Sequence, residues 1–291
     1  MGSMDKTVYQ YTGDQPVDLT QWATTTDTRI KTAQRNADLE TLHDLQRRLY
    51  AQKQTGVVII LQGMDTAGKD GLIRHVFSGF NPAGTSVVSF KQPTSVDLQH
   101  DFLWRINRQL PARGEIRIFN RSQYEDVLIS RVHPEILVGQ HLPDVRSVAD
   151  VTDKFFERRY HDLRHFETYL RHQGIMTYKF FLHISQKEQT ARLERRLALP
   201  EKNWKFSTSD LKERQFWADY QTAYAQMLEH TATAKNPWYI IPADDKPTAR
   251  RLVTAILTQE LSQLDPQYPQ VTADQQAHFQ QLLQQLRKGQ I

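Results

Sequence analysis

The chain of 291 residues is long enough for one large α/β domain with a real hydrophobic core, and its formal net charge at pH 7 is +4. It has no cysteine, which excludes a disulfide framework, a thiolate metal site and a cysteine nucleophile, and which suits the cytoplasm where we place the protein. No apolar run reaches the roughly eighteen residues of a membrane span, so we expect no contact with a membrane, and residues 1–4 are typical of a tag rather than of a signal peptide.

The first predicted elements are a helix and a buried strand. Leucine recurs every three or four residues over 38–50, which predicts a helix that covers a sheet. Residues 56–61, Gly-Val-Val-Ile-Ile-Leu, form an unbroken apolar run, which is the pattern of a strand buried on both faces.

A phosphate-binding loop follows this strand at residues 63–70, Gly-Met-Asp-Thr-Ala-Gly-Lys-Asp. A Walker A pattern of this kind turns backbone N–H groups and a helix N-terminus toward an anion, and Lys69 adds positive charge at the terminal phosphate. Asp70 replaces the usual Ser/Thr and has no hydroxyl for Mg²⁺, so Asp65 is our candidate metal ligand. The alternative is a glycine-rich turn with a surface lysine. The other candidate phosphate-binding residues of the loop are Gly63, Thr66, Ala67, Gly68 and Asp70.

Strands and helices continue to alternate along the chain. The further predicted strands are 86–90, 115–119, 176–184 and 238–241, and the clearest helical patterns between them include 101–110 and 151–172. This alternation predicts a doubly wound, five-stranded parallel sheet with right-handed connections and a ligand crevice at the carboxyl ends of its strands. The segments expected to meet there are 63–70, 91–94, 120–126 and 242–246.

Between the fourth and fifth strands we predict a lid over about 189–230. Pro200 breaks its first helix, and Asp210 with Glu213 fits a capping box at the start of the next. An aromatic stripe then follows at helical spacing, which is more typical of a core than of a ligand platform. We expect residues 1–262 to form the main domain and 263–291 to form a linker and a helical tail.

Polar residues follow the third strand at 120–126 and are expected to face the crevice. Arg121 and Arg131 can form forked hydrogen bonds to phosphate oxygens, which suits phosphoryl transfer, although either can instead make a structural ion pair. Glu125 and Asp126 can hold metal-bound water or receive a proton, or, for Asp126, orient an arginine.

Basic residues cluster at 154–164 and at 192–214. Such clusters favour a polyanionic partner, although a solvated helix face is the alternative for any run of charge. Nucleic acid is not expected as that partner. The basic residues accompany a phosphate loop rather than a helix-turn-helix, zinc finger or RNA-recognition pattern.

Four segments together resemble the polyphosphate kinase 2 family over about residues 30–262. They are 63–70, Phe-Lys-Gln-Pro-Thr at 90–94, Phe-Asn-Arg-Ser-Gln-Tyr-Glu-Asp-Val-Leu at 119–128, and Asn-Trp-Lys-Phe-Ser at 203–207. The resemblance implies a P-loop kinase-like three-layer sandwich with a helical lid, and transfer of the terminal phosphoryl group of inorganic polyphosphate to nucleotides. It also implies a Mg²⁺ cofactor, with Mn²⁺ as a substitute, and a homo-oligomer such as a tetramer.

Within that family the chain resembles the branch that accepts both AMP and ADP and so makes ADP and ATP reversibly, because Asn120 and Glu125 stand where the ADP branch commonly carries Asp and Asn. Guanine nucleotides are further possible acceptors. The resemblance also implies a role for each candidate residue. Lys69 and Arg121 would bind the transferred phosphoryl group, Asp65 would bind Mg²⁺, and Arg131 would bind the phosphate of the acceptor nucleotide. Contacts with polyphosphate or with the lid are implied for Lys91, Arg195 and Lys205.

Three other functions compete with this interpretation. They are an ADP-only polyphosphate kinase, an ATP-dependent nucleoside-monophosphate or small-molecule kinase, and a non-catalytic polyanion-binding module with a vestigial loop. The missing loop hydroxyl counts against the second, and the presence of Asp65, Lys69 and Arg121 counts against the third.

Overall fold

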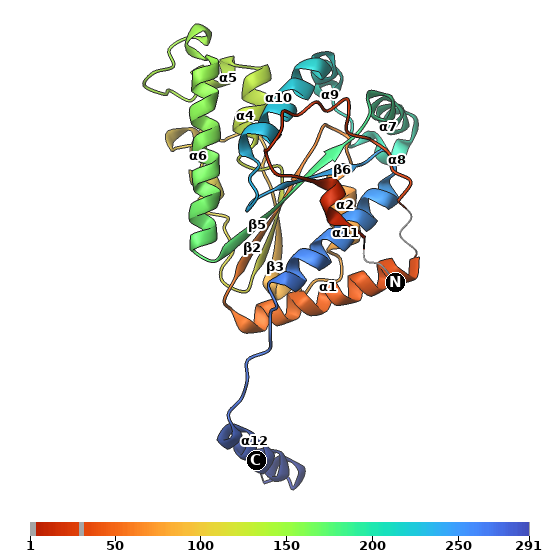
Figure 1. Ribbon diagram of the computed structural model, residues 1–291, viewed down its shortest axis with the longest axis vertical. Helices are drawn as coiled ribbons and strands as arrows, with labels where there is room; N and C mark the ends of the chain where they lie inside the picture. The colour runs from red at the N-terminus through yellow and green to blue at the C-terminus, as the bar shows by residue number, and fades with distance from the viewer. Residues whose placement is uncertain (1–3, 29–31, 291) are drawn as a thin grey trace.

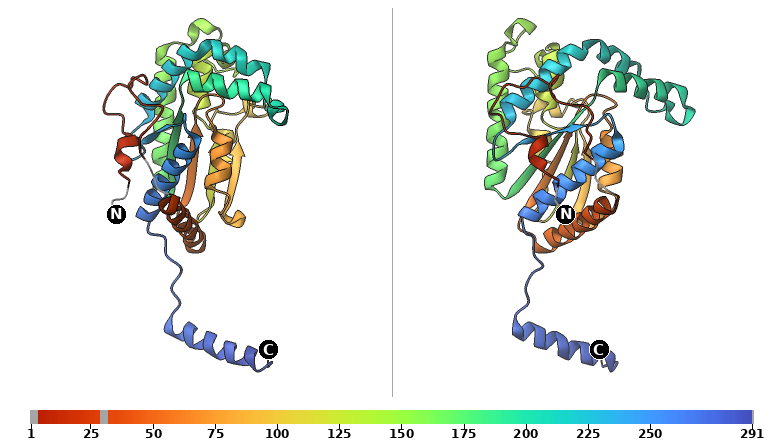
Figure 2. Two further views of the ribbon diagram at one scale, coloured as in Figure 1. Left: turned by 90° about the vertical axis from the view of Figure 1, so that its right-hand side faces the viewer. Right: turned by 45° about the vertical axis from the view of Figure 1, so that its right-hand side comes forward.

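A six-stranded sheet lies between two layers of helices in the computed structural model, which describes residues 4–28 and 32–290 (Figures 1 and 2). The strand order is β1-β6-β5-β2-β4-β3. The strands are β1 (Gln10–Tyr11), β2 (Gly56–Gln62), β3 (Thr85–Ser89), β4 (Ile116–Asn120), β5 (Ile175–His183) and β6 (Trp238–Pro242). The expected tag falls mainly on residues 1–3, which lie outside the described residues.

Five of these strands are parallel, which confirms the predicted doubly wound sheet. β2 lies at the centre with every residue buried, and Ile59 is paired with Ile118 of β4 on one side and Tyr178 of β5 on the other. The sixth strand, β1, pairs antiparallel with β6 and was not predicted. Its two residues are too few to show an alternating pattern, so the count of five strands was one short.

The helices on the two faces give the expected three-layer sandwich. One layer contains α1 (Thr32–Gln52), α2 (Lys69–Val76) and α11 (Lys246–Gln263), and the other contains α4 (Glu125–Val132), α6 (Asp153–His172) and α10 (Trp217–Thr231). β5 is contacted by α6 from one layer and α11 from the other, so its side chains are enclosed on both sides. A sheet covered in this way leaves its carboxyl edge as the natural place for a ligand.

The part of the predicted lid that projects from the body is made of α7 (Gln186–Ala198), α8 (Pro200–Asn203) and α9 (Thr208–Glu213) (Figure 2). By contrast, α10 packs on α4 and α6 and buries Tyr224, Met227 and Leu228, which confirms the core interpretation of the aromatic stripe. The expected capping box was wrong. Ser207 caps α9, whereas Asp210 lies inside the helix and pairs with Arg196.

The helix predicted at 101–110 is also largely wrong, because only α3 (Trp104–Asn107) forms there. Asp101 Oδ1 accepts a hydrogen bond from the backbone N–H of Leu103 at 3.0 Å, and this local turn competes with a helical start. A second short helix, α5 (Glu135–Val138), follows α4.

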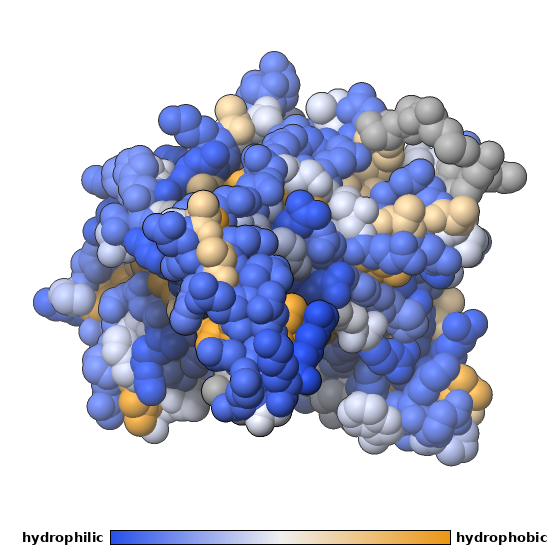
Figure 3. Space-filling view, turned by 90° about the horizontal axis from the view of Figure 1, so that it is seen from below, coloured by the Kyte–Doolittle hydropathy of each residue, from blue (hydrophilic) through white to orange (hydrophobic). Residues whose placement is uncertain are grey.

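The last helix, α12 (Ala273–Arg287), stands apart from the body at the end of an extended segment (Figures 1 and 2). Its Phe279, Leu283 and Leu286 are exposed, while the face of the molecule seen from below is mainly hydrophilic with small separate apolar patches (Figure 3). The division into a domain at 1–262 and a tail at 263–291 stays a prediction. None of the described helices is both long enough and apolar enough to span a membrane.

Candidate functional site

The loop between β2 and α2 has the backbone geometry of an anion site. Gly68 caps α2 with a left-handed φ of 107°, and Thr66 has a φ of 69° that a side-chain-bearing residue rarely adopts. A Cβ on Gly63 would lie 2.8 Å from the Leu182 carbonyl oxygen, so only glycine fits there. Thr66 Oγ1 is buried and has no hydrogen-bond partner among the described residues. A strained loop with an unpartnered hydroxyl is expected where a ligand completes the hydrogen bonding.

Lys69 lies buried under this loop and bonds its backbone. Its Nζ donates to the carbonyl oxygens of Gly63 at 2.5 Å and Met64 at 3.3 Å. Burial, and then the charge of Arg121, lower the pKa of Lys69 to about 8, although Asp65 and Glu125 oppose the shift. The ammonium group is therefore poorly compensated in the protein alone, and a phosphate would stabilise it.

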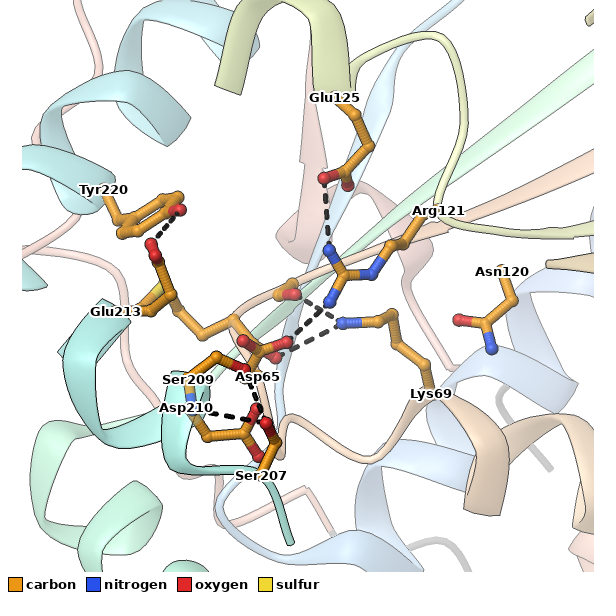
Figure 4. Close-up of polar contacts among 12 residues, drawn as sticks. Asp65, Lys69, Asn120, Arg121, Glu125, Ser207, Ser209, Asp210, Glu213 and Tyr220 are labelled. Atoms are coloured by element: carbon orange, nitrogen blue, oxygen red, sulfur yellow. Dashed lines mark hydrogen bonds and ion pairs between the residues drawn. The ribbon is translucent and has the colours of Figure 1, made fainter. Parts of the chain in front are cut away.

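Arg121 is held between two carboxylates (Figure 4). Its Nη2 donates to Asp65 Oδ1 at 2.6 Å and its Nη1 to Glu125 Oε2 at 3.3 Å, which places the guanidinium beside Lys69. Glu125 is the main cause that raises the pKa of Arg121 above its ordinary value. Arg121 itself has a φ of 66°, so the turn after β4 is strained in order to aim this side chain. The predicted meeting of 63–70 with 120–126 is confirmed.

Asn120 and Asp70 connect the loop with the lid. Asn120 Nδ2 donates to Asp70 Oδ1 at 2.9 Å, and Lys205 Nζ lies 3.4 Å from Asp70 Oδ2. Burial disfavours the ionised form of Asp70, yet the bond from Asn120 and the charge of Lys205 together hold its pKa below the usual range. Asp70 therefore serves here as an acceptor for lid and strand residues.

A basic cleft of about 570 Å³ opens beside the loop. Of its described lining residues, ten are basic and three are acidic, so its potential is strongly positive. The predicted Arg195 and Lys205 are in its wall, whereas Lys91 is exposed elsewhere. Arg74 and Arg250, which also line the cleft, were not predicted, and Lys246 was given no role, because these residues come from α2 and α11 and share no sequence cluster. Burial, and then the charges of Arg192 and Arg195, lower the pKa of Lys246 to about 8.

Arg192 has a different role from the one its place in a basic cluster predicted. Its side chain is 4% exposed and donates to four backbone carbonyl oxygens at 2.6–2.9 Å. Two of these carbonyls, of Thr66 and Ala67, belong to the phosphate loop, and two, of Ala243 and Asp244, follow β6. The guanidinium therefore fixes the loop after β2 to the end of β6, which lies two strands away in the sheet. No motif identifies it, and the only sequence signal is Glu188 four residues earlier, which pairs with its Nε.

Arg131 is not brought to the phosphate loop. Its Nη2 donates to Asp153 Oδ1 at 2.6 Å, and its guanidinium carbon lies 4.5 Å from the centre of the Phe156 ring. The structural ion pair was the alternative considered for this residue. Its assignment to the acceptor phosphate stays a prediction that requires this pair to open.

The residues around the loop fit a metal ion that takes most of its ligands from substrate and water. No group of three or more His, Cys, Asp or Glu side chains in the described ranges forms a metal site. Asp65 bonds Arg121 through Oδ1, and no described residue bonds its Oδ2. One carboxylate combined with substrate phosphates is a typical environment for Mg²⁺.

Three comparisons with known proteins give one consistent result. The sequence model of the family described as "Polyphosphate kinase 2 (PPK2)" matches residues 25–269. The chain is 45% identical over 279 residues to an "ADP-polyphosphate phosphotransferase" of Rhodopseudomonas palustris, covering 94% of this chain and 96% of that relative. It is 46% identical over 229 residues to an "AMP/ADP-polyphosphate phosphotransferase" of Meiothermus ruber, covering 79% and 80%. The crystal structure of "Polyphosphate Kinase 2 from Arthrobacter aurescens TC1" matches with a TM-score of 0.82 at 36% identity, covering 96% of this chain and 98% of that one.

Proposed function

Because the chain belongs to the polyphosphate kinase 2 family, we propose that it transfers the terminal phosphoryl group of polyphosphate to both AMP and ADP, reversibly. Polyphosphate-driven phosphorylation of nucleotides is the activity that the relatives' names share, and this chain has the fold, loop and basic cleft for it. Acceptance of AMP is the finer part of the proposal, since one similar relative is named for ADP and the other for AMP and ADP at nearly equal identity.

The observation that carries AMP acceptance is Glu125. In the branch that resembles this chain a carboxylate stands at this position, and here it bonds Arg121 beside the loop. Glu125 and Asp65 bond different nitrogens of the Arg121 guanidinium, so together they fix it in one position. There it can neutralise the charge of the phosphoryl group during transfer. An asparagine at position 125 would provide no charge for this purpose.

Each of the other site residues has a proposed task in the transfer. Loop N–H groups and the N-terminus of α2 bind the phosphate chain, and Lys69 exchanges its bonds to the Gly63 and Met64 carbonyls for phosphate oxygens. Lys69 and Arg121 then stabilise the charge that spreads over the equatorial oxygens, so positioning and charge supply most of the catalysis. Kinases of this family depend on a metal ion; Mg²⁺, or Mn²⁺ in its place, would be held by Asp65 and would neutralise phosphate charge.

The basic cleft is the proposed path of the polyphosphate chain. The wall residues Arg74, Arg195, Lys205, Lys246 and Arg250 come from both the body and the lid, so a bound chain would draw these parts together. Such sequence-independent binding of a polyanion needs charge density rather than shape. We further propose a cytoplasmic homo-oligomer, such as a tetramer, whose mass light scattering can determine.

Chromatography of the nucleotide products tests the proposal. With polyphosphate and Mg²⁺, AMP is expected to yield ADP and then ATP, and ADP to yield ATP, without any nucleoside triphosphate as donor. Glu125→Asn is expected to lower the rate with AMP at least about tenfold more than the rate with ADP, since asparagine is the residue that the ADP branch commonly carries at this position. Product from ADP alone would leave an ADP-only kinase, and a need for ATP as donor would indicate the nucleoside-monophosphate kinase alternative.

The pH profile is expected to report the two lysines of low pKa. Both Lys69 and Lys246 have pKa values of about 8 in the free protein, so they lose their charge above that pH. The value of kcat/KM for polyphosphate, which follows the free enzyme, should therefore decline above about pH 8. The value of kcat should decline only at higher pH, because bound phosphates stabilise the charged lysines. A profile of kcat/KM that stays flat to about pH 9.5 would contradict this.

A further inference from the structure

The N-terminal segment of residues 4–24, which we call the strap, crosses the carboxyl edge of the sheet. It precedes the part of the chain that matches the family model, so none of the site motifs includes it. β1 in the strap pairs with β6, and Leu19 is buried in the core. From β1 the strap runs past α10 to the start of α7 (Figure 1). The strap is therefore a packed part of the body that reaches the point where the lid begins.

Asp244, just after β6, joins the end of the strap to the lid. Its Oδ2 accepts a hydrogen bond from Thr24 Oγ1 at 2.8 Å, and its backbone N–H donates to the Thr24 carbonyl oxygen at 3.0 Å. Its Oδ1 accepts from the backbone N–H of Ser185 at 2.8 Å. Hydrogen bonds to an ionised carboxylate are stronger than those between neutral groups. One carboxylate thus holds two segments that are far apart in the sequence.

Ser185 fixes the first turn of α7. Its side chain caps the helix by accepting from the backbone N–H of Glu188 at 3.0 Å, while its own backbone N–H bonds Asp244. Two turns later the helix carries Arg192, whose guanidinium bonds the phosphate loop and also the Asp244 carbonyl oxygen. We call these two turns the base of the lid. Asp244 is bonded to both of its ends.

A second bond holds the strap at the same place. His183, the last residue of β5, is buried, and its Nε2 donates to the Leu19 carbonyl oxygen at 3.1 Å. The backbone carbonyl of His183 accepts from the N–H of Ala243 at 2.8 Å, so the ends of β5 and β6 stay adjacent. The strap and these two strand ends therefore form one unit, on which the base of the lid rests.

We propose that Asp244 is a positioning residue for phosphoryl transfer. With Thr24 of the strap, it fixes the base of the lid so that Arg192 holds the phosphate loop in its working geometry. This inference rests on the proposed function, which supplies the reaction. Asp244 is not among the described residues that line the basic cleft, so it acts through α7 rather than on the substrate.

Hydrogen exchange of the free protein tests the base of the lid without any substrate. Asp244→Ala removes both side-chain bonds and is expected to speed exchange of the amides of residues 188–192 at least about tenfold. Thr24→Val removes only the bond from the strap and should speed it about threefold. Thr20→Val is the matched control, because the side-chain bond of this strap threonine, to Asp18, stays within the strap. Its exchange in α7 should match that of the wild type.

Steady-state kinetics, at a temperature at which every variant is folded, measure the effect on the reaction. Asp244→Ala is expected to lower kcat at least about tenfold, because small displacements of the loop are costly in rate. Asp244→Asn should keep kcat within about threefold of the wild type, since its amide retains an acceptor for Ser185 and a partner for Thr24. A residue that only stabilises the fold would leave the kcat of every folded variant at the wild-type value.

The two measurements separate this inference from the proposed function. Wild-type exchange in α7 together with wild-type kcat for folded Asp244→Ala would overturn the inference and leave the proposed function intact. Faster exchange with unchanged kcat would also overturn it, because the base of the lid would then not matter for the reaction. If exchange is faster as expected but the wild type transfers no phosphate from polyphosphate, the connection that Asp244 makes is supported and the proposed function fails.

Discussion

Replacing Lys69 by methionine is expected to lower kcat for phosphoryl transfer by about a thousandfold. Methionine keeps an unbranched side chain of similar length and removes only the ammonium group. In the structure that group already lies at the loop, bonded to the Gly63 and Met64 carbonyls, so it needs little movement to reach a phosphate. The measurement is kcat with saturating polyphosphate and ADP.

The stability of this variant separates a catalytic loss from a folding loss. Burial lowers the pKa of Lys69 to about 8, whereas an unfolded lysine titrates near about 10.4. Between these values the unfolded chain binds the proton and the folded chain does not, so stability rises with pH through this window and the buried charge is destabilising at pH 7. Lys69→Met should therefore melt no lower than the wild type at pH 7.

A second lysine of the cleft serves as the control for this experiment. Lys202 lines the cleft from α8 and makes no contact with the loop backbone among the described hydrogen bonds. Lys202→Met is expected to raise the KM for polyphosphate with kcat nearly unchanged. If Lys69→Met retained about a tenth of wild-type kcat, its assignment to the transferred phosphoryl group would be wrong.

The parts of the site that could be predicted are those in which neighbouring residues of the sequence form a recognisable pattern. The apolar run at 56–61 and the loop at 63–70 are patterns of this kind. Since parallel strands end at one edge of the sheet, the position of 120–126 after another strand then predicted that it lies near the loop. The same reasoning located residue 246 near the crevice. Each of these steps requires only chain order and element type, which the alternation of strands and helices supplies.

The parts that could not be predicted depend on side chains that meet across the fold. Arg74 and Arg250 reach the basic cleft from α2 and α11, and nothing in their neighbourhoods distinguishes them from surface arginines. The network of Asp126, Gln140 and Arg159 joins three segments through two hydrogen bonds. Periodicity identifies the buried face of a helix but not the contacts that its polar residues make.

Replacing Arg192 by methionine is expected to destabilise the protein by about 3 kcal/mol or more and to reduce kcat strongly. The guanidinium donates to carbonyls of Thr66, Ala67, Ala243 and Asp244, and its loss leaves these buried acceptors without their partner. The loop would lose its connection with the end of β6, so Lys69 and the loop N–H groups would no longer be held in place. Chemical denaturation measures the first effect and steady-state kinetics the second.

Arg195, one helical turn later in α7, is the matched control for Arg192. It lines the basic cleft, but none of the described hydrogen bonds connects it with the loop. Arg195→Met should therefore raise the KM for polyphosphate and leave the melting temperature within a degree or two of the wild type, since exposed charges contribute little to stability. If Arg192→Met instead behaved like Arg195→Met, with normal stability and only weaker polyphosphate binding, Arg192 would be a substrate contact, and the loop would be held by its own backbone.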